Sequence, residues 1–171
     1  MGIAEQLAGG VLGFPDGGGR NMGRIYDAMV QFFREDEWPF TEIQGKPILR
    51  TGFSGDNGQW ACFAQAREEQ DQFIFYSILQ LRAPEEKRPA IAEFITRANY
   101  GMVIGNFEMD YSDGEIRYKT SIDVEGAELT FPLIRNLVYA NVRVMDRYLP
   151  GIMQILYADV TPEEAIRSIE G

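Results

Sequence analysis

Three consecutive extended stretches, residues 47–54, 58–67 and 71–80, constrain the fold of this chain more than any other feature of its sequence. The turn sequence GDNG separates the first stretch from the second, and the polar sequence REEQD separates the second from the third. Extended stretches bounded by such turn signals are typical of an antiparallel meander. The sequence therefore predicts three neighbouring antiparallel strands.

The middle stretch carries apolar side chains on both of its alternating faces. Trp60, Cys62 and Ala64 fall on one face, whereas Ala61 and Phe63 fall on the other. A strand that is apolar on both faces is typical of the interior of a sheet. We therefore expect this stretch to form a central strand.

A second hairpin is predicted for residues 102–109 and 115–123, which flank an Asp-Gly turn signal. One alignment of the two stretches places apolar residues opposite each other on one face and opposite charges on the other. The pairs predicted by this alignment are Met109 with Ile116, Phe107 with Tyr118, and Glu108 with Arg117. We expect the apolar pairs to face the helices and the charged pair to face water.

Helical patterns account for most of the remaining chain. Apolar side chains recur at helical spacing over residues 22–36, over residues 86–100 and over a longer stretch that begins at Thr130. Pro150 is expected to kink or interrupt this long helix, because proline cannot donate a backbone hydrogen bond. A last short helix is predicted from the capping box that opens at Thr161.

The order of these elements, α-β-β-β-α-β-β-α with a further short α at the end, predicts an α+β fold. We expect an antiparallel sheet of about five strands with the helices packed on one side. Glycines are concentrated in residues 1–23, so residues 1–20 are predicted to form a flexible glycine-rich arm. Residues 21–171 are predicted to form a single domain.

Composition excludes several classes of chemistry. The chain has no histidine and a single cysteine, Cys62, which excludes His-ligated metal sites, His-dependent catalytic pairs and an intrachain disulfide. Asp and Glu outnumber Lys and Arg by 26 to 16, and the formal charge of −10 argues against a nucleic-acid partner. No apolar run is long enough for a membrane span. We expect a cytoplasmic, non-enzymatic protein without a metal or a cofactor.

The chain also contains a set of short motifs, namely RANYG at 97–101, GNFE at 105–108 and DGEIRY at 113–118, with Trp60 upstream and PEEAI at 162–166. Together they resemble the YbjN-like family of bacteria and cyanobacteria, over roughly residues 22–169. The resemblance implies a sensory-transduction regulator whose fold is related to that of the type III secretion chaperones. It further implies a small, acidic and usually dimeric protein that holds a segment of another protein and performs no chemistry.

On this hypothesis the function is the binding of an unidentified protein partner. The candidate partner-binding residues are Trp60, Asn99, Tyr100, Val144 and Tyr148. Two of them have structural alternatives. Trp60 can pack beneath a helix, and Asn99 can bind backbone groups that are left unpaired at the end of a helix.

The alternative hypothesis is a small-molecule-binding protein, or an enzyme with a carboxylate and tyrosine pocket between the sheet and the helices. Its candidate residues are Glu108, Arg117 and Tyr118. A deep pocket that buries these side chains favours this alternative, whereas a filled core with an exposed apolar groove favours protein binding.

The long C-terminal helix bears on the oligomeric state. Its apolar side chains cover about half of its circumference, which is wider than the roughly 100° stripe that one sheet face needs. Asn141 lies inside this apolar arc and needs either an internal hydrogen-bond partner or its own copy across a two-fold axis. We expect residues 130–158 to contribute to a homodimer or to a partner groove.

Overall fold

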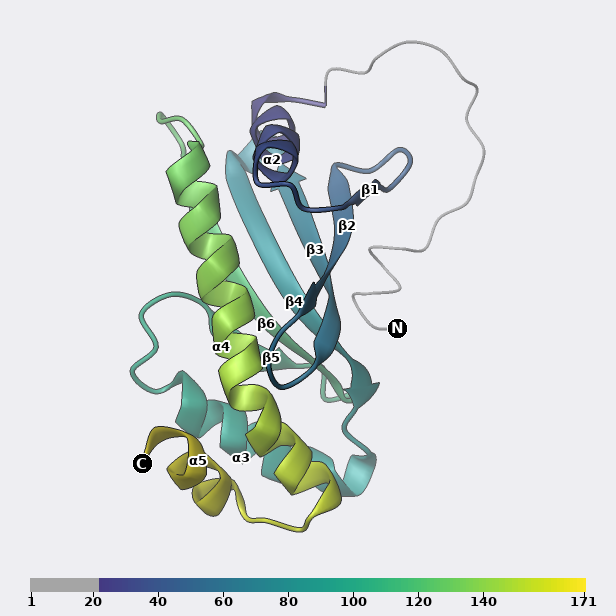
Figure 1. The fold of residues 1–171 in the computed structure, drawn as a ribbon, viewed down its shortest axis with the longest axis vertical. Helices are drawn as coiled ribbons and strands as arrows, with labels where there is room; N and C mark the ends of the chain where they lie inside the picture. Colours follow the sequence, from purple (N-terminus) through teal and green to yellow (C-terminus); the bar gives the residue numbers. More distant parts are fainter. Residues whose placement is uncertain (1–21) are drawn as a thin grey trace.

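The three extended stretches form strands β2 (Ile48–Ser54), β3 (Gln59–Arg67) and β4 (Gln72–Arg82) of one antiparallel sheet. The computed structural model describes residues 22–171 (Figure 1). β3 lies between β2 and β4, so the central position predicted from its two apolar faces is confirmed. The predicted arm, residues 1–20, lies outside the described residues.

The second hairpin consists of β5 (Asn106–Met109) and β6 (Glu115–Asp123). All three predicted cross-strand pairs are present in its register. β6 also pairs with β4, which gives the strand order β1-β2-β3-β4-β6-β5 and leaves β5 at one edge. β5 begins later than the predicted residue 102, because the chain turns at Gly105, whose φ is 80°.

The described residues contain six strands, one more than the five or so predicted. The additional strand, β1 (Thr41–Glu42), pairs with β2 at two positions only. A strand of two residues has no measurable alternation, so the pattern of the sequence could not reveal it.

The helices confirm the predicted α+β fold. They are α2 (Arg24–Glu35), α3 (Arg88–Asn99), α4 (Phe131–Tyr157) and α5 (Pro162–Glu170), with short 3₁₀ helices η1 (Glu68–Gln70) and η2 (Glu85–Lys87) in connections. α4 runs along one face of the sheet, α2 lies near one end, and α3 and α5 pack together near the other end (Figure 1). The predicted capping box of α5 is present at Thr161.

Pro150 does not interrupt α4, which is one continuous helix of 27 residues. Proline at this position leaves the carbonyl of Asp146 without its usual helical donor. The side-chain Nδ2 of Asn57 donates to that carbonyl at 3.1 Å. A hydrogen bond from the β2–β3 turn therefore replaces the one that the proline removes.

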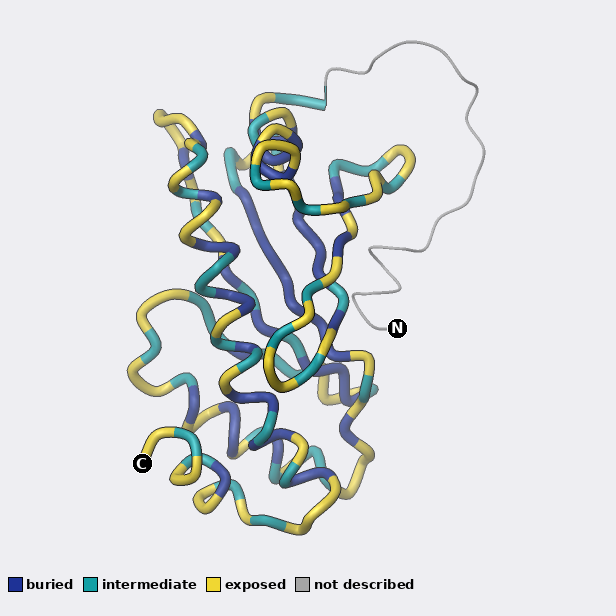
Figure 2. The backbone as a smooth tube through the Cα atoms, viewed as in Figure 1, coloured by how far each residue is buried: buried dark blue, intermediate teal, exposed yellow. Residues whose placement is uncertain are grey.

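Two apolar clusters fill the two faces of the sheet. The larger lies between the sheet and the helices, and it contains the fully buried Phe33, Phe75 and Met145. Figure 2 shows that most of the central strands are coloured as buried. The smaller lies on the opposite face and consists of Ile48, Phe63, Ile74, Tyr76 and Ile78. This arrangement explains why β3 needs apolar side chains on both faces.

Candidate functional site

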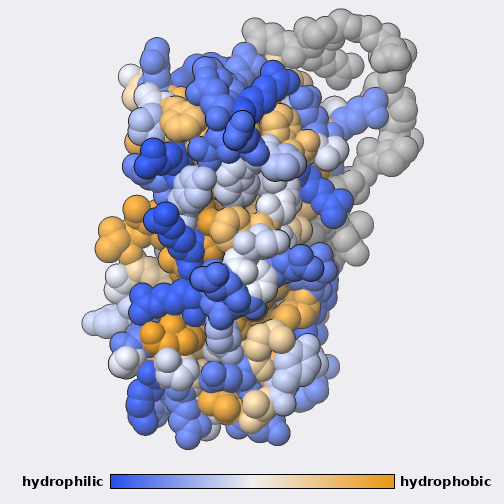
Figure 3. All heavy atoms as spheres, viewed as in Figure 1, coloured by the Kyte–Doolittle hydropathy of each residue, from blue (hydrophilic) through white to orange (hydrophobic). Residues whose placement is uncertain are grey.

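The loop between α3 and β5 exposes large apolar side chains beside α4. Tyr100 is 92% exposed, Val103 is 95% exposed and Ile104 is 44% exposed. Most large apolar side chains among residues 22–171 are buried, so three exposed ones in one loop form an unusual surface. Figure 3 shows hydrophobic atoms gathered on the surface where this loop lies.

The base of this loop is fixed although its apolar side chains are exposed. The hydroxyl of Tyr118 donates to the carbonyl of Ile104 at 2.5 Å. Burial raises the pKa of Tyr118 to about 12, so the hydroxyl stays protonated and remains a donor at neutral pH. The amide of Asn99 binds the backbone of Phe107 on the other side of the loop. The loop therefore presents its apolar side chains from a fixed frame.

A groove lies between this loop and the middle of α4. Its volume is about 530 Å³, and its main lining residues are 100–104, Tyr118, Ala140, Val144, Arg147 and Tyr148. We call it the α4 groove. Ala140, Val144 and Tyr148 follow one another at a spacing of four residues, which places them on one side of the helix. These three residues therefore form an apolar stripe on the helix wall of the groove, beside Arg147.

Tyr148 ties this wall to the C-terminal helix α5. Its hydroxyl donates to a carboxylate oxygen of Glu170 at 2.5 Å. Burial, together with Glu170, raises the pKa of Tyr148 to about 12. The guanidinium of Arg147 lies 5.7 Å from the centre of the Tyr148 ring. The tyrosine thus acts as a fixed part of the wall, and it stays protonated at neutral pH.

A second, more polar hollow continues from the α4 groove along the same helix. It has a volume of about 420 Å³ and is lined by Asp36, Arg135, Asn136, Tyr139, Ala140 and Arg143. We call it the upper hollow. It shares Ala140 with the groove, so the two form one surface over residues 135–148 of α4. At 1.5 Å per residue this surface is about 20 Å long.

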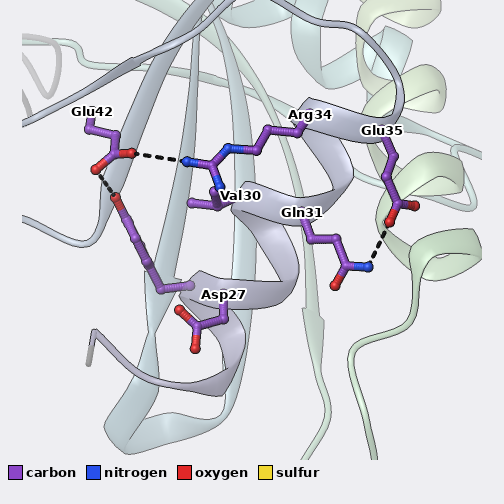
Figure 4. Close-up of a pocket in the computed structure, with 7 residues that line it drawn as sticks. Asp27, Val30, Gln31, Arg34, Glu35 and Glu42 are labelled. Atoms are coloured by element: carbon purple, nitrogen blue, oxygen red, sulfur yellow. Dashed lines mark hydrogen bonds and ion pairs between the residues drawn. The ribbon is translucent and has the colours of Figure 1, made fainter. Parts of the chain in front are cut away.

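Another pocket lies between α2 and β1, and its polar side chains bind one another (Figure 4). The hydroxyl of Tyr26 donates to Glu42 at 3.1 Å, and Arg34 lies 3.9 Å from the same carboxylate. Burial and the hydrogen bond to Glu42 raise the pKa of Tyr26 to about 12, so it cannot act as a base near neutral pH. These contacts join α2 to β1, and a structural role accounts for them.

Three of the five predicted partner-binding residues come together in the α4 groove. They are Tyr100, Val144 and Tyr148. Trp60 does not belong to the groove, because it is 3% exposed in the core and its Nε1 donates to Ser77 at 2.8 Å. The contacts of Trp60 are therefore those of a core residue, which is the structural alternative for this side chain.

Asn99 is also engaged within the chain. Its Oδ1 accepts from the backbone N–H of Phe107 at 2.7 Å, and its Nδ2 donates to the carbonyl of Phe107 at 3.0 Å. Both ends of the amide are used, so it is not offered to a partner. The contribution of Asn99 is to frame the loop that forms one side of the groove.

The alternative polar pocket is not formed by its three candidate residues. Glu108 and Arg117 lie on the sheet face away from the helices, where Arg117 Nε donates to Glu108 at 2.6 Å. Tyr118 is fully buried on the opposite face. Neighbouring residues of a strand point to opposite faces, so Arg117 and Tyr118 cannot line one cavity. These three side chains therefore do not line one pocket.

The predicted pair of Glu108 and Arg117 includes a third residue, and its carboxylate is partly buried. Lys119 also contacts the carboxylate of Glu108, and the side chain of Glu108 is 23% exposed. Burial acts to raise the pKa of Glu108, but the hydrogen bonds and charges of Lys119 and Arg117 outweigh it and lower the pKa. The expectation that the pair faces open water was therefore only partly right.

Asn141 has its hydrogen-bond partners inside the chain. Its Nδ2 donates to the carbonyls of Phe75 at 3.0 Å and Tyr118 at 3.1 Å, and it lies 3.2 Å from the hydroxyl of Thr120. The side chain is fully buried. Of the two alternatives for this amide, the structure has the internal one, and the amide is not available to a two-fold partner.

Residues 22–171 contain no group of three or more potential metal ligands. Cys62 is buried, and burial raises the pKa of its thiol to about 12, which keeps it protonated and unreactive. None of the helices in this part of the chain combines the length and apolarity needed to cross a bilayer.

Sequence reasoning missed Val103, Ile104 and the arginines beside the groove. The only local signal for the loop is the pair of glycines that bound it, Gly101 and Gly105, both with positive φ. Between them the residues MVI have the composition of a strand. Their exposure follows from tertiary structure and could not be recognised from the pattern.

Comparisons with known proteins identify relatives of the chain and of its fold. A family model described as "YbjN: Putative bacterial sensory transduction regulator" matches residues 26–154. The structure is similar to the "Crystal structure of YbjN, a putative transcription regulator from E. coli", with a TM-score of 0.55, 12% sequence identity, and coverage of 78% of this chain and 90% of that chain. At this identity the likeness shows a shared fold.

A second solved structure that is similar is the HopA1–SchA chaperone–effector complex. Its TM-score is 0.45 at 16% sequence identity, with 71% of this chain and 90% of that chain covered. Among curated protein sequences no match is found.

Proposed function

Because this chain belongs to the YbjN family, described as bacterial sensory transduction regulators, we propose that it is a regulatory protein that binds a segment of another protein in the α4 groove. It acts by binding and performs no catalysis. The occupant is an extended or helical segment of a partner whose apolar side chains enter the groove. The proposal locates the protein in the cytoplasm, in keeping with a single buried cysteine.

The observation that supports this function best is the exposed apolar loop beside an apolar helix wall. Tyr100 and Val103 leave more than nine-tenths of their surface in water, and they face a groove whose helix wall includes Val144. Such a surface releases ordered water when an apolar segment covers it, which favours binding. A fixed loop also loses less conformational entropy on binding than a mobile one.

The proposal can be tested by selecting ligands without prior assumptions about their sequence. A phage-displayed library of random dodecapeptides is selected on the full chain, and the recovered peptides are then measured by fluorescence anisotropy. We expect peptides with two or more large apolar residues. Their affinity for the double variant Val103→Asp, Val144→Glu should fall by at least about tenfold, because both changes place a carboxylate against apolar side chains of the ligand.

Met153→Glu provides the matched control. Met153 is 39% exposed on the same helix but does not line the groove, so an identical type of change there should leave peptide affinity unaltered. If no selected peptide distinguishes the groove variant from Met153→Glu, the α4 groove is not the binding surface. A homodimer through residues 130–158 is a competing occupant, and it would appear as a doubled mass in sedimentation that Val144→Glu returns to the monomer value.

A further inference from the structure

The exposed side of α4 carries three arginines next to the groove and the upper hollow. Arg135, Arg143 and Arg147 are all exposed, and they follow one another at multiples of four residues along the helix. Arg135 and Arg143 line the upper hollow, and Arg147 lines the α4 groove. These residues form what we call the arginine stripe.

The arginine stripe forms no ion pair within the described chain. Among residues 22–171, none of the three arginines forms an ion pair within 4.0 Å. Arg143 instead lies over the ring of Tyr139 at 5.6 Å. A guanidinium over an aromatic ring keeps its charge and its hydrogen-bond donors available to a ligand.

The carboxylates of α4 and of the two hollows form hydrogen bonds with other groups. The only acidic residue of α4, Asp146, accepts backbone hydrogen bonds from Asp56 and Asn57 at 3.0 and 2.9 Å. In the upper hollow, Asp36 accepts from the Tyr139 hydroxyl at 2.7 Å. At the other end, Glu170 accepts from Tyr148. α4 itself carries three arginines and one aspartate, a net charge of 3 − 1 = +2, on a chain whose formal charge is −10.

We propose that the segment bound along α4 is acidic, with carboxylates that pair with the arginine stripe and apolar side chains that enter the groove. This inference rests on the proposed function and adds the chemistry of its partner. Charge complementarity of this kind selects partners and speeds their association. A second copy of this chain is a poorer occupant, because a two-fold axis through this face brings the same arginines of both copies together.

The spacing of the arginines fits an extended acidic segment. Arg143 and Arg147 are four residues apart, which corresponds to about 6 Å along the helix. Carboxylates on alternate residues of an extended chain are about 6.6 Å apart. An alternation of acidic and apolar residues therefore presents carboxylates to the stripe and apolar side chains to the groove from opposite sides of the same segment.

The test uses three labelled peptides that differ only in charge. Each alternates leucine with one polar residue, which is glutamate, glutamine or lysine, and binding to the full chain is measured by fluorescence anisotropy. We expect the glutamate peptide to bind at least about tenfold more tightly than the glutamine peptide. Raising the salt from about 0.05 M to about 0.5 M should remove most of that difference.

Charge reversal of the stripe should reverse the preference. The double variant Arg143→Glu, Arg147→Glu should lose the glutamate peptide and gain affinity for the lysine peptide. The milder variant Arg143→Gln, Arg147→Gln should bind all three peptides equally. The matched control is Arg50→Glu, because Arg50 is exposed on β2 outside both hollows. Circular dichroism verifies that each variant is folded.

The outcomes separate this inference from the proposed function. Equal binding of the glutamate and glutamine peptides, with both lost in the Val103→Asp, Val144→Glu variant, overturns the acidic partner and supports a groove that binds apolar segments. Binding of the glutamate peptide that is insensitive to the groove variant contradicts the proposed function. An equal loss in Arg50→Glu and in the stripe variant shows that overall charge, and not the stripe, is responsible.

Discussion

The side-chain amide of Asn99 pairs with both backbone groups of Phe107, accepting from its N–H at 2.7 Å and donating to its carbonyl at 3.0 Å. β5 is an outermost strand of the sheet, so its outward backbone groups have no neighbouring strand. Asn99 takes the place of that strand at one residue. It also joins the last residue of α3 to the beginning of β5, which sets the ends of the exposed loop.

Asn99→Ala should therefore lower both the stability of the fold and the affinity of the groove. The N–H of Phe107 loses its partner and its carbonyl keeps only the hydrogen bond from Asn106 Nδ2 at 3.3 Å, so we expect a cost of about 1–3 kcal/mol in the free energy of unfolding from urea denaturation. Thr96→Ala on the same helix is the control, because the Thr96 hydroxyl bonds only the carbonyl of Ala92. That variant should change stability by less than about 0.5 kcal/mol. Equal effects of the two substitutions would contradict this role of Asn99.

The register of the β5–β6 hairpin predicts very different costs for two neighbouring side chains. Phe107 is 2% exposed and packs against the rings of Tyr118 and Tyr148, so Phe107→Ala should cost about 3–5 kcal/mol. Arg117→Ala should cost only about 1 kcal/mol, since Lys119 remains as a partner of Glu108. Thermal and urea unfolding of both variants measure this difference. A reversed order would require another register.

Glu108 should contribute to stability in a pH-dependent way. Lys119 and Arg117 hold its pKa below the ordinary value in the folded state, despite the opposing effect of burial. The stabilisation is therefore fully present above the unfolded-state pKa of about 4.3 and is lost as the pH falls through the lowered folded-state pKa. In the Glu108→Gln variant, the free energy of unfolding should therefore decrease less as the pH falls. Urea denaturation recorded as a function of pH measures this decrease.

The control for this pH dependence is Glu128→Gln, which removes one negative charge at an exposed position. In this control, the free energy of unfolding should decrease at acid pH nearly as it does in the unaltered chain. If the Glu108→Gln variant loses as much stability at acid pH as the unaltered chain, other carboxylates are responsible for the acid sensitivity.

The predictability of this fold differs between elements for physical reasons. The β5–β6 register was predictable because apolar and charged pairs on opposite faces both require the same alignment. β1 has only two residues and depends on its pairing with β2. The continuation of α4 through Pro150 depends on Asn57, which lies in a different turn and cannot be identified as a partner from the local sequence.

The candidate site was predictable only in part for a similar reason. Tyr100, Val144 and Tyr148 were candidate partner-binding residues, the last two as part of the wide apolar arc of the long helix, but Val103 and Ile104 have the local pattern of a strand. The chain turns at Gly105, where an added Cβ would lie 2.5 Å from the carbonyl oxygen of Lys119, so that only glycine fits. The sequence shows the three arginines, but only the structure shows that they form no ion pair with carboxylates of residues 22–171.

Asn141→Leu tests whether the buried amide of α4 serves the core or an intersubunit contact. Its Nδ2 donates to the carbonyls of Phe75 and Tyr118, and its Oδ1 has no partner among the described residues. The substitution keeps the volume but removes these hydrogen bonds, so we expect a loss of about 1–3 kcal/mol in urea denaturation. The sedimentation mass should equal that of the unaltered chain at the same concentration. A changed mass with unaltered stability would instead place Asn141 at a contact between copies.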